Sequence, residues 1–321
     1  MNGAINYTYG FSHGVEWGWP IAVYLLLAGI SGGALIVALL VRFYKKQHVD
    51  TPLLKAASLV SFVTIAFGMV FLVGDLEKPL YFWKILIHYN FTSVMSIGVM
   101  AISVYIPLTL IMCLYMFEKE ILSYIPQSWA KIVEYFVVIM GILRKLRPLI
   151  EVLSVIFAVV ICAYTGFLIS VLVRFPILNT AILPALFVVS GLSAGTASAS
   201  MIASYFFKEE THSSDLKTLH TIEWPIMAIE IMLIAMLFVS LLVGNEFQQT
   251  TTVAFKSGVF ATLFWVGVMG VGFGLPLVLN FALGKKLAHS HAAFYLSGLA
   301  SVVGVLCLRM FIIYAGQTFG V

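Results

Sequence analysis

The chain has 321 residues, of which 61% are hydrophobic and only 10% are charged, and its formal net charge is +4. This composition excludes a soluble globular domain and predicts a membrane protein. The positive charge falls on the loops between apolar runs, where it signals membrane orientation, so a nucleic-acid-binding function is excluded as well.

Apolar runs long enough to cross about 30 Å of hydrocarbon as helices recur along the whole chain. The first is a full spanning segment preceded by aromatic and polar residues, which does not fit a cleavable signal peptide. One longer loop, Glu118 to Pro148, is amphipathic. In sequence order we predict eight transmembrane helices, over residues 19–43, 54–74, 93–117, 150–173, 180–207, 222–244, 256–283 and 290–315.

The lysines and arginines predict which way these helices run, because cytoplasmic loops are enriched in both. Only Lys78, Lys84, Arg174 and Lys256 fall on one side. Both termini should therefore lie on that side, which is the periplasm in a Gram-negative cell, with the protein in the inner membrane. Thirteen basic residues fall on the other side: Arg42, Lys45, Lys46, Lys55, Lys119, Lys131, Arg144, Lys145, Arg147, Lys208, Lys217, Lys285 and Lys286.

An internal repeat is visible in three pairs of segments that keep the same order. "AGISGGALIVALLVRFYKK" (28–46) is similar to "SGLSAGTASASMIASYFFKEE" (190–210), "LVGDLE" (72–77) to "LVGNEF" (242–247), and "SIGVMAISVYIPLTL" (96–110) to "WVGVMGVGFGLPLVL" (265–279). An even number of spans keeps both halves the same way up. The predicted fold is an all-α integral membrane protein built from two tandem four-helix bundles, although chance similarity between apolar helices is the alternative.

The repeat divides the sequence into three parts. Residues 1–148 hold the first three helices and the cytoplasmic loop, residues 149–178 hold the fourth helix, and residues 179–321 form the second unit. Extending the alignment pairs "CAY" (162–164) with "CLR" (307–309), so that Arg309 takes the place of Tyr164.

Cysteine and histidine placement argues against a metal or haem centre inside this protein. The cysteines Cys113, Cys162 and Cys307 are single residues in separate apolar helices, whereas zinc and iron–sulfur sites need clustered ligands. Haem needs histidines facing each other within the bundle, and none of the seven lies well inside a predicted span. We expect no haem, no iron–sulfur cluster and no metal site.

Several polar residues are predicted in the outer half of the membrane. Arg309 lies 18 residues beyond His291, about 27 Å along the helix, and Asp75, Tyr164 and Tyr24 lie at comparable depth. His13 precedes the first helix at the same level. Arg309 could instead extend to the outer headgroups or pair with Asp75, and Tyr164 alone could be a packed core residue.

Two acids in the sixth helix form a second group. Glu223 and Glu230 are seven residues apart, which places them on one helical face. Glu223 is predicted near the inner surface and Glu230 near the midplane, where a carboxylate is costly and indicates function. Together they predict part of a proton path from the cytoplasm.

This set of residues suits the oxidation of a quinol. The reaction releases two protons and two electrons, so its site needs hydrogen-bond partners for the ring oxygens, a base, and a cation to stabilise developing negative charge. His13, Tyr164 or Asp75 could accept protons and Arg309 could stabilise the oxyanion.

Four motifs make the sequence resemble a known family. "WGWPIAVYLLLAGISGGA" (17–34), "GDLEKPLYFW" (74–83), "YTGFLIS" (164–170) with "LPALFVVSGLSAG" (183–195), and "RMFIIYAGQ" (309–317) are similar to the NrfD/PsrC family of membrane anchors of respiratory reductases. The resemblance implies an eight-helix subunit that exchanges electrons between menaquinone and a periplasmic iron–sulfur subunit, with a molybdopterin-type or haem catalytic subunit beyond it.

The resemblance also implies roles for individual residues. Tyr24, Asp75, Tyr164, Glu223, Glu230 and Arg309 match polar family positions, and His13 resembles the pocket histidine before the first helix. The family pocket has an amide side chain just before that histidine, whereas this sequence has Ser12.

The sequence therefore predicts a menaquinol-oxidising anchor of a polysulfide- or thiosulfate-type reductase, with or without proton translocation. The alternatives are the anchor of a periplasmic nitrite reductase, a small-solute or ion transporter with parallel repeats, and a passive anchor whose polar residues only bind partner subunits.

Overall fold

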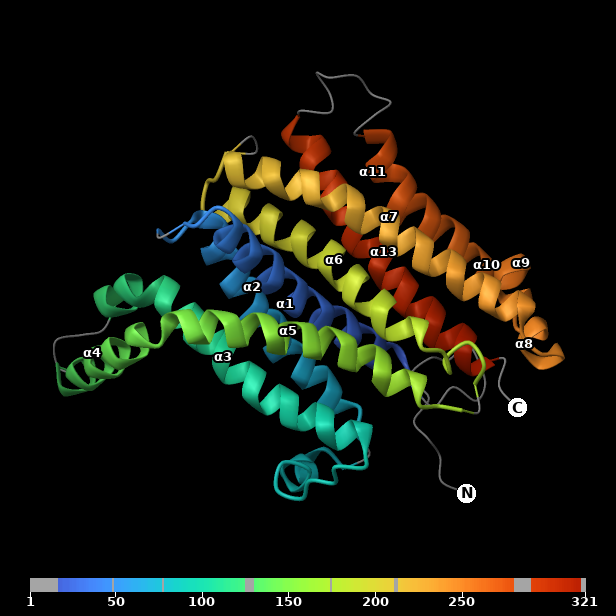
Figure 1. Cartoon of the computed structure of the whole chain (residues 1–321), viewed down its shortest axis with the longest axis horizontal. Coiled ribbons are helices and arrows are strands. Elements are labelled where there is room, and N and C mark those ends of the chain that lie inside the picture. The colour runs from blue at the N-terminus through green and yellow to red at the C-terminus, as the bar shows by residue number, and fades with distance from the viewer. Residues whose placement is uncertain are drawn as a thin grey trace.

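The protein is a bundle of long helices (Figure 1). The computed structural model describes residues 17–47, 49–76, 78–124, 130–173, 175–210, 213–279 and 290–318. Within these ranges, eight helical segments are long and apolar enough to cross a membrane, which confirms the predicted number. They are α1 (Trp19–Tyr44), α2 (Pro52–Gly74), α3 (Val94–Tyr124), α5 (Arg147–Ser170), α6 (Ile182–Phe206), α7 (Ser214–Val243), the continuous segment Gly258–Leu277, and α13 (His291–Thr318).

The seventh of these segments is not a regular α-helix. It begins as α10 (Gly258–Thr262), continues as η3 (Leu263–Gly274), which is a π-helix, and ends as α11 (Leu275–Leu277). A π-helix of this length is unusual, because such turns occur mostly singly and often at functional sites. The remaining short elements are η1 (Pro79–Lys84), α4 (Ala130–Lys145), α8 (Glu246–Thr250) and α9 (Val253–Lys256).

Helices α1 and α6 form the centre of the bundle. In α1, 83% of the residues in its apolar 18-residue stretch are buried inside the protein, a larger share than in any other described span. The two helices approach closely through small residues: a Cβ atom on Gly33 would collide with the carbonyl oxygen of Gly191, and one on Gly195 would collide with the nitrogen of Ala34. The two segments aligned as repeats, 28–46 and 190–210, thus pack directly against each other; whether the two halves are related by internal symmetry stays a prediction.

The beginning of α1 and the end of α13 meet at one end of the bundle, here called the termini end. The backbone nitrogen of Trp17 donates to Oε1 of Gln317 at 2.9 Å, and Nε2 of Gln317 donates to the carbonyl oxygen of Trp17 at 3.1 Å. With eight spans between them, two ends of the polypeptide on one side are the expected arrangement.

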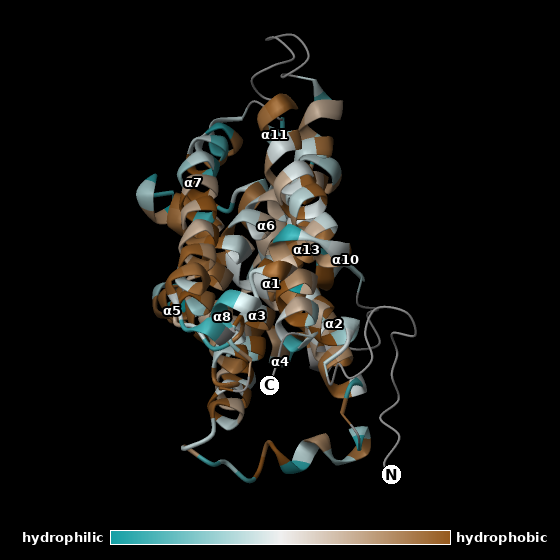
Figure 2. Ribbon diagram, turned by 90° about the vertical axis from the view of Figure 1, so that its right-hand side faces the viewer, coloured by the Kyte–Doolittle hydropathy of each residue, from teal (hydrophilic) through white to brown (hydrophobic). Residues whose placement is uncertain are grey.

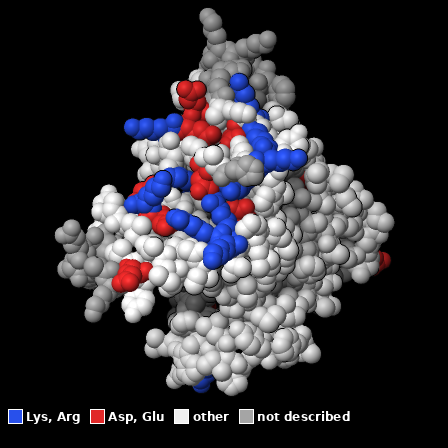
Figure 3. Space-filling view, turned by 60° about the vertical axis from the view of Figure 1, so that its left-hand side comes forward, with Lys and Arg blue, Asp and Glu red and all other residues white. Residues whose placement is uncertain are grey.

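Charged residues gather at the opposite end, here called the basic end. Figure 3 shows Lys, Arg, Asp and Glu concentrated there, while the rest of the described surface in that view is almost entirely uncharged. Hydrophobic residues dominate the sides of the helices between the two ends (Figure 2). This distribution fits a protein whose sides face lipid. The charged residues at the basic end include Arg42, Lys45, Asp50, Lys55, Glu118, Glu120, Arg144, Arg147, Glu151 and Asp215.

Two spans are longer than their apolar runs predicted, and both extensions are polar. Helix α3 continues to Tyr124 rather than ending near residue 117, and Glu120 in the added turns pairs with Lys55 at 3.2 Å. Helix α7 begins at Ser214 rather than near 222, because the Ser213 side chain caps it. The predicted loop Glu118 to Pro148 is therefore mostly helical, since it contains the end of α3 and all of α4.

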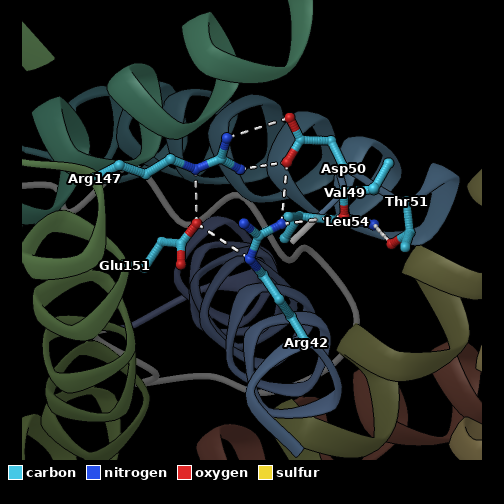
Figure 4. A network of polar contacts seen from close by, with 7 residues as sticks. All are labelled: Arg42, Val49, Asp50, Thr51, Leu54, Arg147 and Glu151. Atoms are coloured by element: carbon cyan, nitrogen blue, oxygen red, sulfur yellow. Dashed lines mark hydrogen bonds and ion pairs between the residues drawn. The ribbon is translucent and has the colours of Figure 1, made fainter. Parts of the chain in front are cut away.

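A network of two arginines and two acids joins α1, the loop after it, and α5 at the basic end (Figure 4). Nη1 of Arg42 lies 3.0 Å from Oδ1 of Asp50, and its Nε lies 3.3 Å from Oε1 of Glu151. Arg147 pairs with the same two acids, with Nε 2.9 Å from Oε1 of Glu151. Partial burial acts in the opposite direction, yet the hydrogen bonds and charges of Arg147 and Arg42 lower the pKa of the Asp50 carboxyl.

We expect Asp50→Asn to destabilise the protein by about 2 kcal/mol at neutral pH, because it leaves two partly buried guanidinium groups short of a countercharge. Because the folded pKa of Asp50 is depressed, its contribution is complete above the unfolded carboxyl pKa of about 3.9 and disappears as the pH falls through the lower folded value. Thermal unfolding in detergent measures the effect. The control is Lys55→Gln, which breaks a more exposed pair worth about 0.5 kcal/mol; equal losses in the two variants would contradict the prediction.

Candidate functional site

Two buried tyrosines from different helices lie close together in the half of the bundle nearest the termini end. Tyr24 on α1 is 0% exposed and Tyr164 on α5 is 7% exposed, and the two side chains are near enough for charge on one to affect the other. A Cβ atom on Gly98 of α3 would overlap the Tyr164 ring at Cζ, so this ring requires glycine at position 98. On α2, the ring of Tyr24 packs over Gly68.

The Tyr24 hydroxyl is a buried polar group that lacks a hydrogen-bond partner among the described residues. Leaving such a group unsatisfied costs about 1–3 kcal/mol, so its position indicates a partner from outside the described residues. Tyr24 and Tyr164, which the sequence singled out together, are thus brought together by the fold.

An apolar groove of about 730 Å³ lies between α2, η1 and α3, at the same turns as the two tyrosines. Met69 and Val99, the residues that follow Gly68 and Gly98, both line it. The groove could hold a lipid-like tail, since only Ser103 adds a hydroxyl to its walls. Its other lining residues are Val70, Val73, Gly74, Phe82, Leu86, Ile102, Ile106 and Pro107.

Asp75 stands at the end of this groove, directly after Gly74. It is the C-cap of α2 and is partly buried. Burial raises the pKa of its carboxyl above the usual value, so Asp75 holds a proton more readily than an exposed aspartate does. His13, the other residue predicted at this level, lies outside the described residues.

Arg309 and Glu230 form a second polar cluster, deeper in the bundle. Arg309 on α13 is 0% exposed; its Nη2 donates to Oγ of Ser190 at 2.7 Å and to the carbonyl oxygen of Phe187 at 3.2 Å. Its guanidinium carbon lies 3.5 Å from the centroid of the Phe187 ring. Glu230 on α7 is 1% exposed and interacts electrostatically with Arg309. Within the described residues no ion pair within 4.0 Å joins Arg309 to Glu230, but the two are near enough to interact electrostatically, and the hydrogen bonds of Arg309 go to α6 rather than to the two tyrosines.

The Arg309 environment excludes the simplest structural explanations of this residue. A fully buried guanidinium does not extend to the headgroups, and no ion pair to Asp75 exists among the described residues. Nε and Nη1 of Arg309 and Oε2 of Glu230 have no hydrogen-bond partner in the same part of the structure.

Glu223 lies two turns from Glu230 toward the basic end and is only partly buried. Its Oε2 lies 3.1 Å from Nδ1 of His220 on the same helix. Of the two acids predicted on one face of this helix, Glu223 therefore lies near the surface and Glu230 lies in the interior. The two carboxyl groups are two helical turns apart and not in direct contact.

The structure adds residues that the sequence did not single out, namely Gly68, Gly98, Phe187, Ser190, Ser193 and Ser301. Gly98 carried a signal, because the repeat aligned it with Gly267; in the structure Gly98 faces the Tyr164 ring and Gly267 faces Cys307. The serines carried little signal, since serine is common among the small residues of membrane helices. Within the described residues, no group of three or more His, Cys, Asp or Glu gathers at a metal-binding distance.

Eight apolar spans with paired tyrosines beside an apolar groove, and with a buried arginine and glutamate, define a multi-pass membrane protein with a polar interior site. Residues 9–321 match the family described as "Polysulphide reductase, NrfD". The protein belongs to this family, as the motifs in its sequence indicated.

Similar proteins agree with this assignment over nearly their whole length. The sequence is 40% identical over 309 residues to the C subunit of polysulfide reductase from Wolinella succinogenes, covering 95% of both proteins. It is 37% identical over 304 residues to "Protein NrfD" of Escherichia coli, covering 94% of this protein and 95% of that one. It is 35% identical over 303 residues to "Protein NrfD homolog" of Haemophilus influenzae, covering 94% of both.

Proposed function

We propose that the protein is the quinone-reactive membrane subunit of a respiratory reductase complex, in which it oxidises menaquinol near the termini end and passes the electrons to an iron–sulfur subunit docked there. In this proposal the basic end faces the cytoplasm and the termini end faces the periplasm of the inner membrane. The name of the Wolinella relative, which is one subunit of a polysulfide reductase, favours a polysulfide- or thiosulfate-type catalytic subunit.

The observation that supports this proposal best is the unpartnered Tyr24 hydroxyl beside Tyr164, at the turns where the apolar groove runs between α2 and α3. A quinol has a polar ring and a long isoprenoid tail, and it supplies two electrons and two protons when it is oxidised. Tyr24 and Tyr164 provide hydroxyl groups for the ring oxygens, and the groove provides an apolar wall for the tail.

The remaining residues of the site handle protons and charge. Asp75, at the end of the groove, is the acceptor we assign for protons released there, and its raised pKa suits a group that holds a proton transiently. His13 remains a second candidate acceptor. We assign Arg309 to the charge balance of Glu230, because its buried guanidinium interacts electrostatically with that carboxyl.

The described spans also favour this function over a transporter. Transporters with internal repeats build their midplane sites from helices that are interrupted by unwound backbone. Among the described residues, each of the eight spans continues from end to end, including α3 and α7, which contain Pro107 and Pro225.

The test is quinol oxidation by the purified intact complex with an artificial electron acceptor, comparing wild type with Tyr164→Phe. Loss of turnover with all subunits still bound supports the proposal. Wild-type turnover in the variant would mean that the quinol reacts elsewhere and that this protein is a passive anchor.

We further propose that Glu223 and Glu230 lie on a proton path from the basic end. In proteoliposomes with an enclosed pH-sensitive dye, Glu230→Gln should lower the number of protons moved per electron while quinol oxidation continues, because the amide fills the same space but cannot exchange a proton. The control is Glu246→Gln on the exposed helix α8. An unchanged proton-to-electron ratio in Glu230→Gln would remove Glu230 from the path.

A further inference from the structure

A small cavity lies at mid-depth in the second half of the bundle, where α6, α7, η3 and α13 run side by side (Figure 1). The volume in which the centre of a water molecule can lie is about 10 Å³. This is room for roughly one water molecule. Three of its walls are polar: Ser193 on α6, Glu230 on α7 and Ser301 on α13. The other lining residues are Val268, Gly272, Phe273, Gly304 and Val305.

The Glu230 carboxyl has unused hydrogen-bonding capacity at this cavity. It is 1% exposed, it lines the cavity together with Ser193, and its Oε2 has no hydrogen-bond partner among the described residues. A buried water typically makes 2–4 hydrogen bonds to polar groups that otherwise lack them. Glu230, Ser193 and Ser301 provide that number around a space of the right size.

The wall opposite Glu230 is formed by the π-helix. Val268, Gly272 and Phe273 of η3 line the cavity, and Gly272 packs on Gly304 of α13 so closely that a Cβ atom on Gly272 would lie 2.8 Å from the Gly304 Cα. The glycine pair draws η3 and α13 together beside the cavity.

The first half of the protein contains a comparison for this site. The repeat aligns Ser31 with Ser193, and Ser31 lies in a closed set of hydroxyls: its Oγ is 3.1 Å from Oγ of Ser61 and 3.0 Å from Oη of Tyr105, and the latter two are 3.0 Å apart. These three hydroxyl groups hydrogen-bond one another and need no bound water or ligand. At the aligned position of the second half, a carboxyl with an unpaired oxygen faces a cavity instead.

We propose that this cavity binds a single water molecule that bridges Glu230, Ser193 and Ser301 and provides the site through which Glu230 exchanges its proton. The positive charge of Arg309, which lies two turns beyond Ser301 on the same face of α13 and interacts with Glu230, selects a neutral water over a metal cation. The water site stands on the cavity and its polar groups. Its part in proton movement rests on the proposed function.

The direct test is a structure of the intact complex at a resolution that shows ordered water, for wild type and two variants. Ser301→Val fills the cavity and removes one hydrogen-bonding group. Ser198→Val is the control, because the Ser198 hydroxyl bonds the Ala194 carbonyl of its own helix at 2.8 Å. We expect density between Ser193, Glu230 and Ser301 in wild type and in the control, and none in Ser301→Val.

Three results would overturn the assignment. They are an empty cavity in wild type, density that persists in Ser301→Val, and density that depends on the alkali cation in the buffer. Should Ser301→Val fail to assemble, Ser301→Ala replaces it, and the expected result is density displaced toward Ser193 because one partner is lost.

Infrared spectroscopy gives a second readout that requires no turnover. The carbonyl band of protonated Glu230, identified by its loss in Glu230→Gln and recorded under conditions in which Glu230 carries its proton, should shift when the complex is moved to D₂O. In Ser301→Val the shift should slow by about tenfold or more because valine takes the volume of the water. Equal rates in wild type and Ser301→Val would contradict the site. If quinol turnover were absent in wild type, the proposed function would fail while these two measurements still decided the water site.

Discussion

Replacing Tyr164 by phenylalanine is expected to lower quinol turnover by about 10²-fold, the usual loss when a group that exchanges a proton with the substrate is removed. The ring should keep its place, because Gly98 leaves space for the ring rather than for the hydroxyl. Assembly and thermal stability should therefore remain close to those of the wild type. Steady-state quinol oxidation by the complex and its subunit content after purification measure the two quantities.

Tyr105→Phe is the matched control, since Tyr105 is also buried but its hydroxyl is bonded by Ser31 and Ser61. It should cost stability, about 1 kcal/mol, and leave turnover intact. Tyr24→Phe should behave in the opposite way: its hydroxyl lacks a partner in the described residues, so stability is kept or raised while the KM for quinol rises by about tenfold. If Tyr164→Phe and Tyr105→Phe lost turnover equally, the site between Tyr24 and Tyr164 would be wrong.

Much of the fold could be predicted because membrane spans obey a length rule. A helix must supply about 20 apolar residues to cross the hydrocarbon, so the apolar runs predict the number and approximate limits of the spans. The same rule fails at the polar ends. The first turns of α7 are held by the Ser213 cap and by the pair between Lys45 and Asp215 at 2.7 Å, and neither contact has an apolar signature.

Sequence position predicts the depth of a residue in the membrane but not the direction in which its side chain points. Arg309, Tyr24 and Tyr164 all lie toward the termini end, as expected, yet the tyrosines face α2 and α3 while Arg309 faces α6. Which face of α13 meets which neighbour depends on packing between helices distant in sequence. For this reason the buried polar residues could be selected from the sequence as candidates, whereas their division into two clusters could not.

The π-helix, and the cavity between Ser193, Glu230 and Ser301, could not be predicted from the sequence for a different reason. Glycines in the segment 265–279 permit close packing, but they do not indicate i to i+5 hydrogen bonding. Serines of membrane helices usually bond their own backbone, as Ser198 and Ser200 do on α6. Ser193 differs from them only through its neighbours Glu230 and Ser301, which belong to other helices.

Arg309→Leu is expected to be the most damaging single replacement in the protein, even though it improves the apolar pattern of α13. It removes the donor to Ser190 and to the Phe187 carbonyl, and it leaves the buried Glu230 without its countercharge. Removal of one member of a buried charge pair costs about 3–5 kcal/mol, so the variant should accumulate poorly and lose its partner subunits. Protein level in the membrane and retention of the other subunits measure this effect.

The double variant Arg309→Leu with Glu230→Gln separates the two roles considered for Arg309. If Arg309 chiefly balances Glu230, removing both charges should recover much of the lost stability, because no uncompensated charge then remains in the interior. The recovered complex should also oxidise quinol, since Tyr24, Tyr164 and Asp75 are unchanged. If Arg309 instead stabilises negative charge on the quinol, the double variant should assemble and stay inactive. An assembled but inactive double variant would therefore return Arg309 to the quinol site, and an active one would establish the charge pair with Glu230 as its role.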